Sequence, residues 1–201
     1  ARTLQAAARK FKVQTVMGNQ GHNFEGMRLI KDWYDAGLLG TVREVHAWTN
    51  RTTTNMVNGK HPTEGEPVPE TLDWDKWLGP NAVTAYSSKI CPGGWRWWWD
   101  FGVGGLGDIG CHTLDVPKYT MGLGYPESVY MDNSINFSHE CQGAKPPQEC
   151  AATYVYKMAG VGGKPPVTIY WYEGGHLPRF PEGMNLGSKI GAGGCLMIGD
   201  K

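Results

Sequence analysis

A carboxylate and an imidazole lie four residues apart in the glycine-rich stretch 104–115, where Asp108 is followed by His112 and then by Asp115. On a helix, this spacing places the three side chains on one face. An imidazole titrates near neutral pH, and a neighbouring carboxylate can orient it and raise its basicity. A solvated helix face has the same spacing, but the glycines at 102, 104, 105 and 107 favour close approach of backbone or ligand. The stretch therefore predicts a group that exchanges a proton with a substrate.

The composition of the 201 residues narrows the function. Lys plus Arg and Asp plus Glu both number 19, so the formal net charge is zero and no nucleic-acid partner is expected. The chain has 29 glycines and nine tryptophans. Aromatic rings among glycine-rich loops favour a carbohydrate or another polyhydroxyl ligand, although most of the rings are expected in the core. The length suits one domain, or one domain with part of another.

The five cysteines form no Cys-x-x-Cys pair, so neither a zinc knuckle nor a redox motif is expected. Cys141 and Cys150 flank a Pro-Pro loop and could pair in an oxidising compartment, which the sequence leaves open. No apolar run approaches the roughly 20 residues of a membrane helix, and no signal peptide is recognised. We expect a soluble protein, cytoplasmic or periplasmic, without a membrane partner. Because the chain lacks an initiator Met and stops soon after a strand pattern, we expect both of its ends to be edges of a longer protein.

The first elements are typical of half an α/β unit. Apolar residues recur at helical spacing over 2–11, and residues 13–17 are expected to form a short buried strand. The polar residues Asn19, Gln20 and His22 follow that strand. Ligands bind at this place in open α/β sheets, just beyond the carboxyl ends of the strands.

A helix should follow, capped by Asn23 and closed by Gly37, and its buried stripe is expected to contain Met27, Ile30, Trp33 and Tyr34. Alternation over 42–50 then predicts a strand with one packed face, made of Val45, Ala47 and Thr49. The opposite face of that strand should be partly wet, with Glu44, His46, Trp48 and Asn50. A long loop over 51–70 is expected to form a flap or an arm.

The remaining elements alternate between helix and strand. A short helix is expected over 71–80, and the helix that starts near Gly105 should kink or restart at Pro117. Strand character is found in 128–137, 151–158, 167–173 and 195–198, and a Gly/Pro-rich turn should join the second and third of these as an antiparallel pair.

Three segments, 17–22, 42–51 and 95–115, together resemble the Gfo/Idh/MocA (glucose-fructose oxidoreductase / inositol dehydrogenase-like) oxidoreductase family. The most specific element is a degenerate Gly-Gly-x-x-x-Asp-x-x-x-His-x-x-Asp motif, which starts at Gly104 and ends at Asp115. The Leu-Gly-Pro stop over 78–80 also matches. The resemblance covers nearly the whole chain, and mostly concerns the family's C-terminal domain.

The resemblance implies an α+β fold, with a largely antiparallel open sheet that carries helices on one face. Residues 1–22 would be the last helix and strand of a dinucleotide-binding Rossmann domain. Residues 23–201 would be the substrate-binding, catalytic sheet domain, truncated at its C-terminus. The chain contains neither a Gly-x-Gly-x-x-Gly fingerprint nor the family's Glu-Lys-Pro motif, whose Lys assists catalysis. We therefore expect NAD or NADP to be bound mainly by an N-terminal domain outside this chain, and weakly or not at all by this chain alone.

The resemblance also implies hydride transfer between nicotinamide and a carbinol of a sugar, cyclitol or related polyol. His112 would be the catalytic acid/base, and Asp108 would orient its ring. The substrate-binding candidates are Asp115, Arg96, Trp95 and His22, and the cofactor-binding candidates are Asn19 and Gln20. The expected partners are the small-molecule substrate and further copies of the chain, assembled through the sheet face.

Three other interpretations stay open. Relatives with the same fold cleave glycosides through a transient keto sugar, so the parent protein could be an NAD-dependent glycosidase. The chain could instead be a non-catalytic carbohydrate-binding or assembly module. A metal-dependent hydrolase would need ligands such as Asp108, His112, His139 and Glu140, but their spacing matches no established ligand pattern, so no metal is expected. Asn19, Gln20, His22 and Asp115 could also have purely structural roles.

Overall fold

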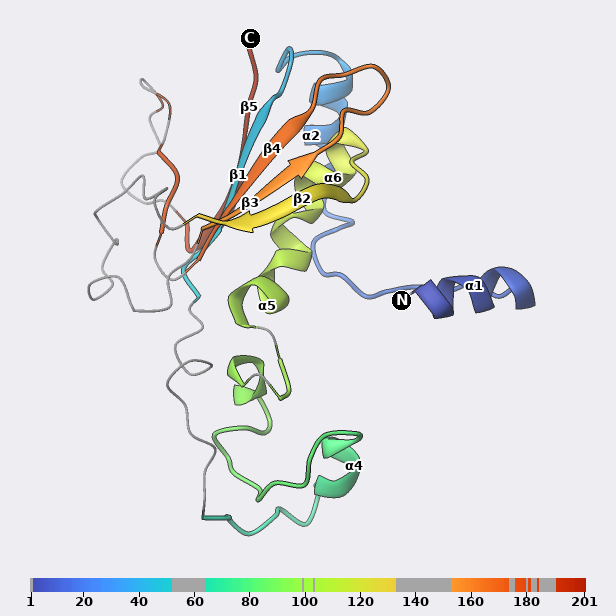
Figure 1. The fold of residues 1–201 in the computed structure, drawn as a ribbon, viewed down its shortest axis with the longest axis vertical. Coiled ribbons are helices and arrows are strands. Elements are labelled where there is room, and N and C mark those ends of the chain that lie inside the picture. Colours follow the sequence, from blue (N-terminus) through green and yellow to red (C-terminus); the bar gives the residue numbers. More distant parts are fainter. Residues whose placement is uncertain are drawn as a thin grey trace.

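The computed structural model describes residues 2–51, 64–98, 100–102, 104–132, 153–173, 176–179, 181, 184 and 191–201. Its centre is a five-stranded sheet with the order β2-β3-β4-β1-β5 (Figure 1). The strands are β1 (Glu44–Thr49), β2 (Pro126–Met131), β3 (Thr153–Met158), β4 (Val167–Tyr172) and β5 (Gly193–Ile198). β1 runs parallel to β4, and the other neighbours are antiparallel, including the predicted pair β3–β4. The largely antiparallel sheet is therefore confirmed.

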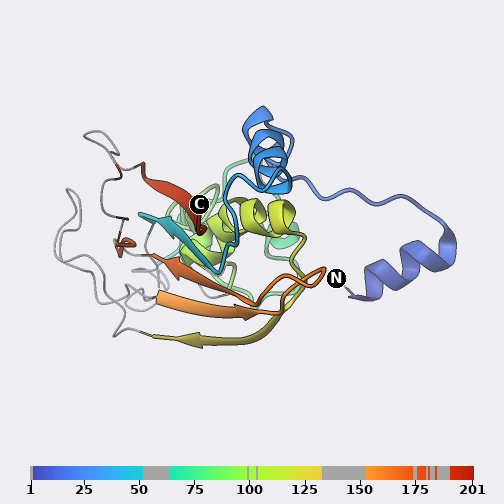
Figure 2. The ribbon, with the colours of Figure 1, turned by 90° about the horizontal axis from the view of Figure 1, so that it is seen from above.

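The described helices are α1 (Arg2–Phe11), α2 (Glu25–Asp35), α4 (Trp74–Leu78), α5 (Gly104–Thr113) and α6 (Asp115–Met121), with a 3-10 turn η1 (Gly94–Trp97). α2 and α6 lie side by side on one face of the sheet, and α5 leads into α6 (Figures 1 and 2). The main core lies between these helices and the sheet, and consists of Tyr34, Val42, Val45, Met121, Leu123, Met158, Val167 and Ile169. This α+β arrangement, with helices on one face, is the predicted fold class.

α1 lies apart from the sheet (Figure 1), and none of its residues is buried. The expected buried strand over 13–17 is wrong: these residues form no strand, and Val16 is 94% exposed. A strand needs a neighbour to take its ladder hydrogen bonds, and no described strand pairs with this segment. The division of the chain at residue 22 stays a prediction.

α2 forms where expected and ends before Gly37, which adopts a φ of 73°. Asn23 does not cap it: the N-cap residue is Phe24, which makes no side-chain hydrogen bond to the helix. The predicted buried stripe is correct for Met27 and Tyr34, but Trp33 is 51% exposed. The helix therefore buries a narrower stripe than its apolar residues suggested.

His46 and Trp48 are buried, so the predicted partly wet face of β1 is wrong at these two residues, while Glu44 is half-buried and Asn50 is exposed. The His46 ring stacks on Tyr170, with 5.1 Å between ring centroids, and Nδ1 lies 2.7 Å from the Tyr172 hydroxyl. The Trp48 ring occupies the space beside Gly194, where a Cβ atom would collide with it. Burial of polar residues is possible here because aromatic neighbours on β4 and a glycine on β5 cover β1.

The helix after Gly104 restarts rather than kinks. α5 ends at Thr113, and α6 begins at Asp115, so Pro117 falls in the first turn of α6, where its missing N–H costs no helical hydrogen bond. The short helix over 71–80 is found as α4, whose N-cap Asp73 accepts a hydrogen bond from the Lys76 amide. Most of the loop over 51–70 lies outside the described residues.

Candidate functional site

The segment before α2 is bound to α5 through two hydrogen bonds. The Asn19 side chain donates to the Cys111 carbonyl at 2.9 Å, and Nδ1 of His112 donates to the Gln20 carbonyl at 3.1 Å. A carbonyl oxygen can only accept, so the neutral His112 ring carries its proton on Nδ1 and has a free lone pair on Nε2. This contact makes Nε2 the ring atom of His112 that can accept a proton.

His22 and Asp115 form the closest imidazole–carboxylate contact on this surface. Nδ1 of His22 donates to Oδ2 of Asp115 at 2.6 Å, and the His22 ring meets the Tyr119 ring edge-on. The Asp115 side chain is mostly buried, whereas the His22 side chain is partly exposed. Both residues were predicted as substrate-binding candidates, and the structure brings them together as a pair whose free Nε2 atom can meet a ligand.

Asp108 does not orient His112, which corrects the expectation from their spacing. One carboxylate oxygen of Asp108 accepts from Nε of Arg96 at 2.8 Å, and the other accepts from Nη1 of Arg51. All hydrogen bonds found for the Asp108 carboxylate go to these two arginines. A carboxylate that bridges two guanidinium groups fixes their positions, so Asp108 orients Arg51 and Arg96.

Arg96 and Trp95 line a cavity of about 400 Å³ beside the start of α5. The guanidinium carbon of Arg96 lies 4.7 Å from the Trp95 ring centroid, which is a cation–π contact, and Nη1 donates to the Gly93 carbonyl. The cavity offers charged hydrogen-bonding groups and aromatic rings together, and its lining residues are Trp95, Arg96, Asp100, Phe101, Gly102, Gly104, Gly107 and Asp108.

Glu173, which the sequence did not predict as a site residue, packs against the start of α5. It follows β4, is only 2% exposed, and accepts hydrogen bonds from Nε1 of Trp171 at 3.1 Å and from the Leu106 amide. Burial raises the pKa of this carboxyl, and the two donors oppose the rise. The glycine at 105 allows this close approach, because a Cβ on it would lie 3.1 Å from Oε2 of Glu173 and 3.3 Å from the Arg51 carbonyl.

The predicted residues therefore fall into two groups along α5 and α6. Trp95, Arg96 and Asp108 gather at the start of α5, and the second group, at the α5–α6 junction, contains His112, Asp115, Asn19, Gln20 and His22. Arg51 and Glu173 were missed as site residues. The one signal for them is that both follow strands, β1 and β4, which run parallel and so end at the same edge of the sheet.

One polar atom in this site is buried without a partner. Oδ1 of Asn19 has no hydrogen-bond partner among the described residues, although Nδ2 of the same amide donates to the Cys111 carbonyl. A buried acceptor of this kind is costly unless a donor meets it. It therefore fits a ligand that presents an N–H or O–H group between the 19–22 segment and α5.

Among the described residues, no group of three or more metal-binding side chains is found. His139 and Glu140, from the metal-hydrolase interpretation, lie outside the described residues, as do Cys141 and Cys150. Cys91, Cys111 and Cys195 are free thiols. No helix in the described ranges has the length and apolar character to cross a membrane.

Three comparisons with known proteins bear on this chain. The family model described as "Oxidoreductase family, C-terminal alpha/beta domain", of the Gfo/Idh/MocA group, matches residues 25–144, more than half of the chain. No curated protein matches. Among solved structures, the super-repressor mutant of Gal80p from Saccharomyces cerevisiae is similar over 100% of this chain, with 15% identity and a TM-score of 0.49. The chain spans 42% of the length of that structure.

Proposed function

Because the chain belongs to the Gfo/Idh/MocA oxidoreductase family, through its C-terminal α/β domain, we propose that it is the substrate-side part of an NAD(P)-dependent oxidoreductase. The reaction is hydride transfer between nicotinamide and a carbinol of a sugar, cyclitol or related polyol. The observation that carries this proposal is the hydrogen bond from Nδ1 of His112 to the Gln20 carbonyl. It leaves Nε2 of His112 free to accept the proton of a substrate hydroxyl.

In the oxidative direction, Nε2 of His112 removes the hydroxyl proton as the carbinol C–H bond breaks. The positive charge on the imidazolium is stabilised because its Nδ1–H already points at the Gln20 carbonyl dipole. His22 presents a second Nε2 atom close by, held by Asp115, and binds a neighbouring hydroxyl of the same polyol. A substrate with several hydroxyls thus meets two imidazoles.

The substrate is positioned by the cavity at the start of α5. Arg96 is fixed by Asp108 and by the Gly93 carbonyl, so its guanidinium is already oriented before a ligand binds. Guanidinium N–H groups donate to ring hydroxyls, and the aromatic lining packs against the apolar face of a sugar. These contacts orient the carbinol, whereas His112 transfers the proton.

The residues present fit the nicotinamide end of the cofactor. The unpaired Oδ1 of Asn19 is a suitable acceptor for a carboxamide N–H, and the Gln20 backbone lies beside it. When bound, the cofactor supplies the hydride acceptor or donor of the reaction. The remainder of the dinucleotide is assigned to a domain that includes residues 1–22, in agreement with the exposed apolar side chains Leu4, Phe11, Val16 and Met17.

The proposal also includes assembly of copies through the sheet. The edge strand β2 exposes Val129, Tyr130 and Met131, and no described helix covers the face of the sheet opposite α2 and α6 (Figure 2). Large exposed apolar side chains of this kind favour a protein interface.

The full-length protein tests the function. Purified protein is assayed with NAD⁺ and NADP⁺ against a panel of sugars, sugar acids and cyclitols, and NAD(P)H formation is followed by absorbance. The variant His112→Asn should lower kcat by at least about 100-fold with little change in cofactor affinity. Cys111→Ala, an exposed neighbour on the same helix, is the matched control and should keep the activity.

Three outcomes would contradict the proposal. Unchanged turnover in His112→Asn would remove His112 as the acid/base. Net hydrolysis of aryl glycosides with only catalytic NAD⁺ would make the parent protein a glycosidase. Saturable sugar binding without any turnover would make it a binding module.

A further inference from the structure

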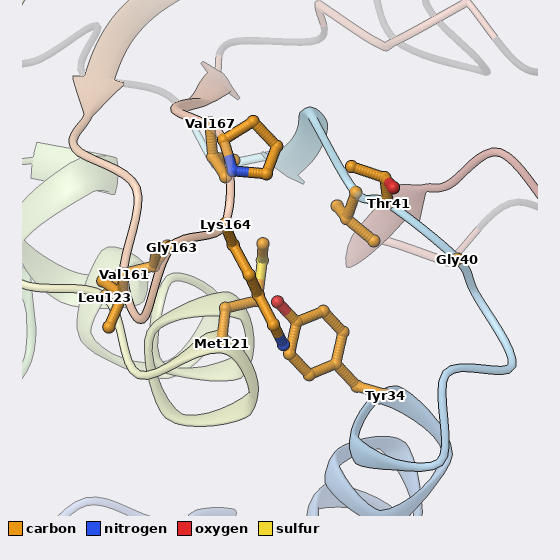
Figure 3. Close-up of a pocket in the computed structure, with 11 residues that line it drawn as sticks. Tyr34, Gly40, Thr41, Met121, Leu123, Val161, Gly163, Lys164 and Val167 are labelled. Carbon is orange, nitrogen blue, oxygen red and sulfur yellow. The ribbon is translucent and has the colours of Figure 1, made fainter.

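A second cavity, of about 260 Å³, lies around the C-terminal end of α6, among α2, the segment after it and the turn between β3 and β4 (Figure 3). The residues that line its wall include Tyr34, Val42, Met121, Leu123, Lys164 and Val167. None of the lining residues belongs to the candidate functional site, which surrounds α5 and the start of α6. This cavity therefore needs its own explanation.

The inner wall of the cavity is apolar. Four of the lining residues are buried members of the main core, and they come from the end of α6, the residues after it, the segment before β1 and the start of β4: Met121, Leu123, Val42 and Val167. Binding of an apolar ligand to this wall is favourable, because it removes hydrocarbon surface of both from water.

Tyr34 and Lys164 each bring a hydrogen-bond donor to the cavity. Tyr34 is 6% exposed, its hydroxyl points into the cavity (Figure 3), and no hydrogen bond to that hydroxyl is found among the described residues. Nζ of Lys164 lies 3.9 Å from the centroid of the Tyr34 ring. The Lys164 ammonium group can only donate hydrogen bonds, and the Tyr34 hydroxyl can donate one. The complementary group on a ligand is therefore a strong hydrogen-bond acceptor.

The charges around the cavity favour an anion. Asp200 accepts a hydrogen bond from the Thr41 amide, which keeps the pKa of its carboxyl below the usual value, so it stays ionised. Three cationic side chains outweigh this carboxylate: Lys164 in the cavity, Arg43 close to Asp200, and Lys201, whose Nζ reaches the Gly37 carbonyl. A negative group on a ligand therefore meets an excess of positive charge.

We propose that this cavity binds a small carboxylate with a flat apolar body. The carboxylate lies between Nζ of Lys164 and the Tyr34 hydroxyl, and the body packs against Met121 and Leu123. Lys164 gives up its cation–π contact with the Tyr34 ring for a charge-assisted hydrogen bond, which is the stronger interaction. The turn before Lys164 contains Gly162 and Gly163, both at positive φ, and its glycine backbone lets the Lys164 side chain shift toward the carboxylate.

The test uses benzoate as the probe and full-length protein labelled with ¹³C at the methionine methyl groups. Benzoate should shift the Met121 methyl resonance saturably, with a Kd on the order of 1 mM for so small a ligand. Benzamide has the same shape without the charge, and should bind at least tenfold more weakly. Lys164→Met should weaken benzoate binding at least tenfold, Tyr34→Phe about threefold, and the distant control Lys76→Met not at all.

Two results would overturn the proposal: no saturable Met121 shift below about 50 mM benzoate, or equal binding of benzoate by Lys164→Met and the unchanged protein. If either cavity variant fails to fold, the comparison of benzoate with benzamide on the unchanged protein decides. Equal affinities of the two probes would then exclude a carboxylate site.

Discussion

His22 and Asp115, 93 positions apart in the chain, are joined by a hydrogen bond of 2.6 Å between Nδ1 and Oδ2. The contact connects the segment before α2 to the first turn of α6. Two further bonds, from Asn19 and to Gln20, connect the same segment to α5. The imidazole–carboxylate pair of this surface is therefore made between two segments, not within one helix.

Loss of the His22–Asp115 bond should loosen the segment 19–24 without unfolding the domain. His22→Ala should raise hydrogen-exchange rates of these amides, while the free energy of unfolding falls by less than about 1 kcal/mol, because the pair is partly exposed. Exchange is measured by mass spectrometry alongside urea unfolding. Lys76→Ala, which removes an exposed pair on α4, should leave exchange in 19–24 unchanged. Equal exchange in His22→Ala and the unchanged protein would show that the contact does not hold the segment.

Asp108→Asn should raise KM and leave the pH dependence of the base unchanged. The variant loosens Arg96, which is proposed to position the substrate, and its neighbour Arg51, but among the described residues no hydrogen bond joins Asp108 to the His112 ring. Steady-state kinetics across pH on the full-length enzyme check this, with Arg96→Ala expected to raise KM in the same way. A shift in the apparent pKa of kcat/KM in Asp108→Asn alone would instead restore the direct pairing of Asp108 with His112.

Glu173→Gln should change the pH dependence of stability. Burial raises the pKa of Glu173 above its unfolded value of 4.5, so the folded state holds the proton more tightly than the unfolded state. The contribution of Glu173 is fully present below pH 4.5 and is lost as pH rises through the folded pKa. The stability of Glu173→Gln relative to the unchanged protein should therefore increase across this window.

Urea unfolding at several pH values measures this difference. Burial lowers the pKa of His46 and of His176, so these residues destabilise the fold as pH falls. Because they are present in both proteins, their effects cancel in the comparison of Glu173→Gln with the unchanged protein. A difference that stays constant with pH would show that Glu173 is ionised in the fold.

Gly105→Ala should destabilise the protein by about 1–3 kcal/mol, because the new methyl group would press on Oε2 of Glu173 and on the Arg51 carbonyl. Thermal unfolding checks this. Gly26→Ala is the matched control in α2, where a Cβ meets nothing within 4 Å, and it should stabilise the helix by up to about 1 kcal/mol. Equal stability of the two variants would mean that Gly105 is not needed for close approach.

The strands and helices of the sheet domain were predictable because their patterns are local. Alternation in β3 and β4 and helical spacing in α2 reflect one buried face each, and Pro117 marked the restart at α6. Local patterns fail where burial comes from distant segments. The Trp48 ring is buried against Gly194, and residues 13–17 pair with no described strand.

The sequence placed Asp108 and His112 on one helix but did not predict their contacts. Asp108 and His112 share a helix face by spacing, but Asp108 is bound to Arg51 and Arg96, whose positions depend on the end of β1 and on η1. The only sequence signal for Glu173 is its place after a strand, because its contacts come from the parallel pairing of β1 with β4 and from the absence of a side chain at Gly105.

The most direct test of the account is the tautomer of His112. ¹⁵N NMR of imidazole-labelled full-length protein, with His112→Asn to assign the signal, reports which ring nitrogen carries the proton at a pH where the ring is neutral. The hydrogen bond to the Gln20 carbonyl predicts a proton on Nδ1 and a bare Nε2. A proton on Nε2 would contradict the account, since His112 could not then take a proton from a substrate hydroxyl at that position.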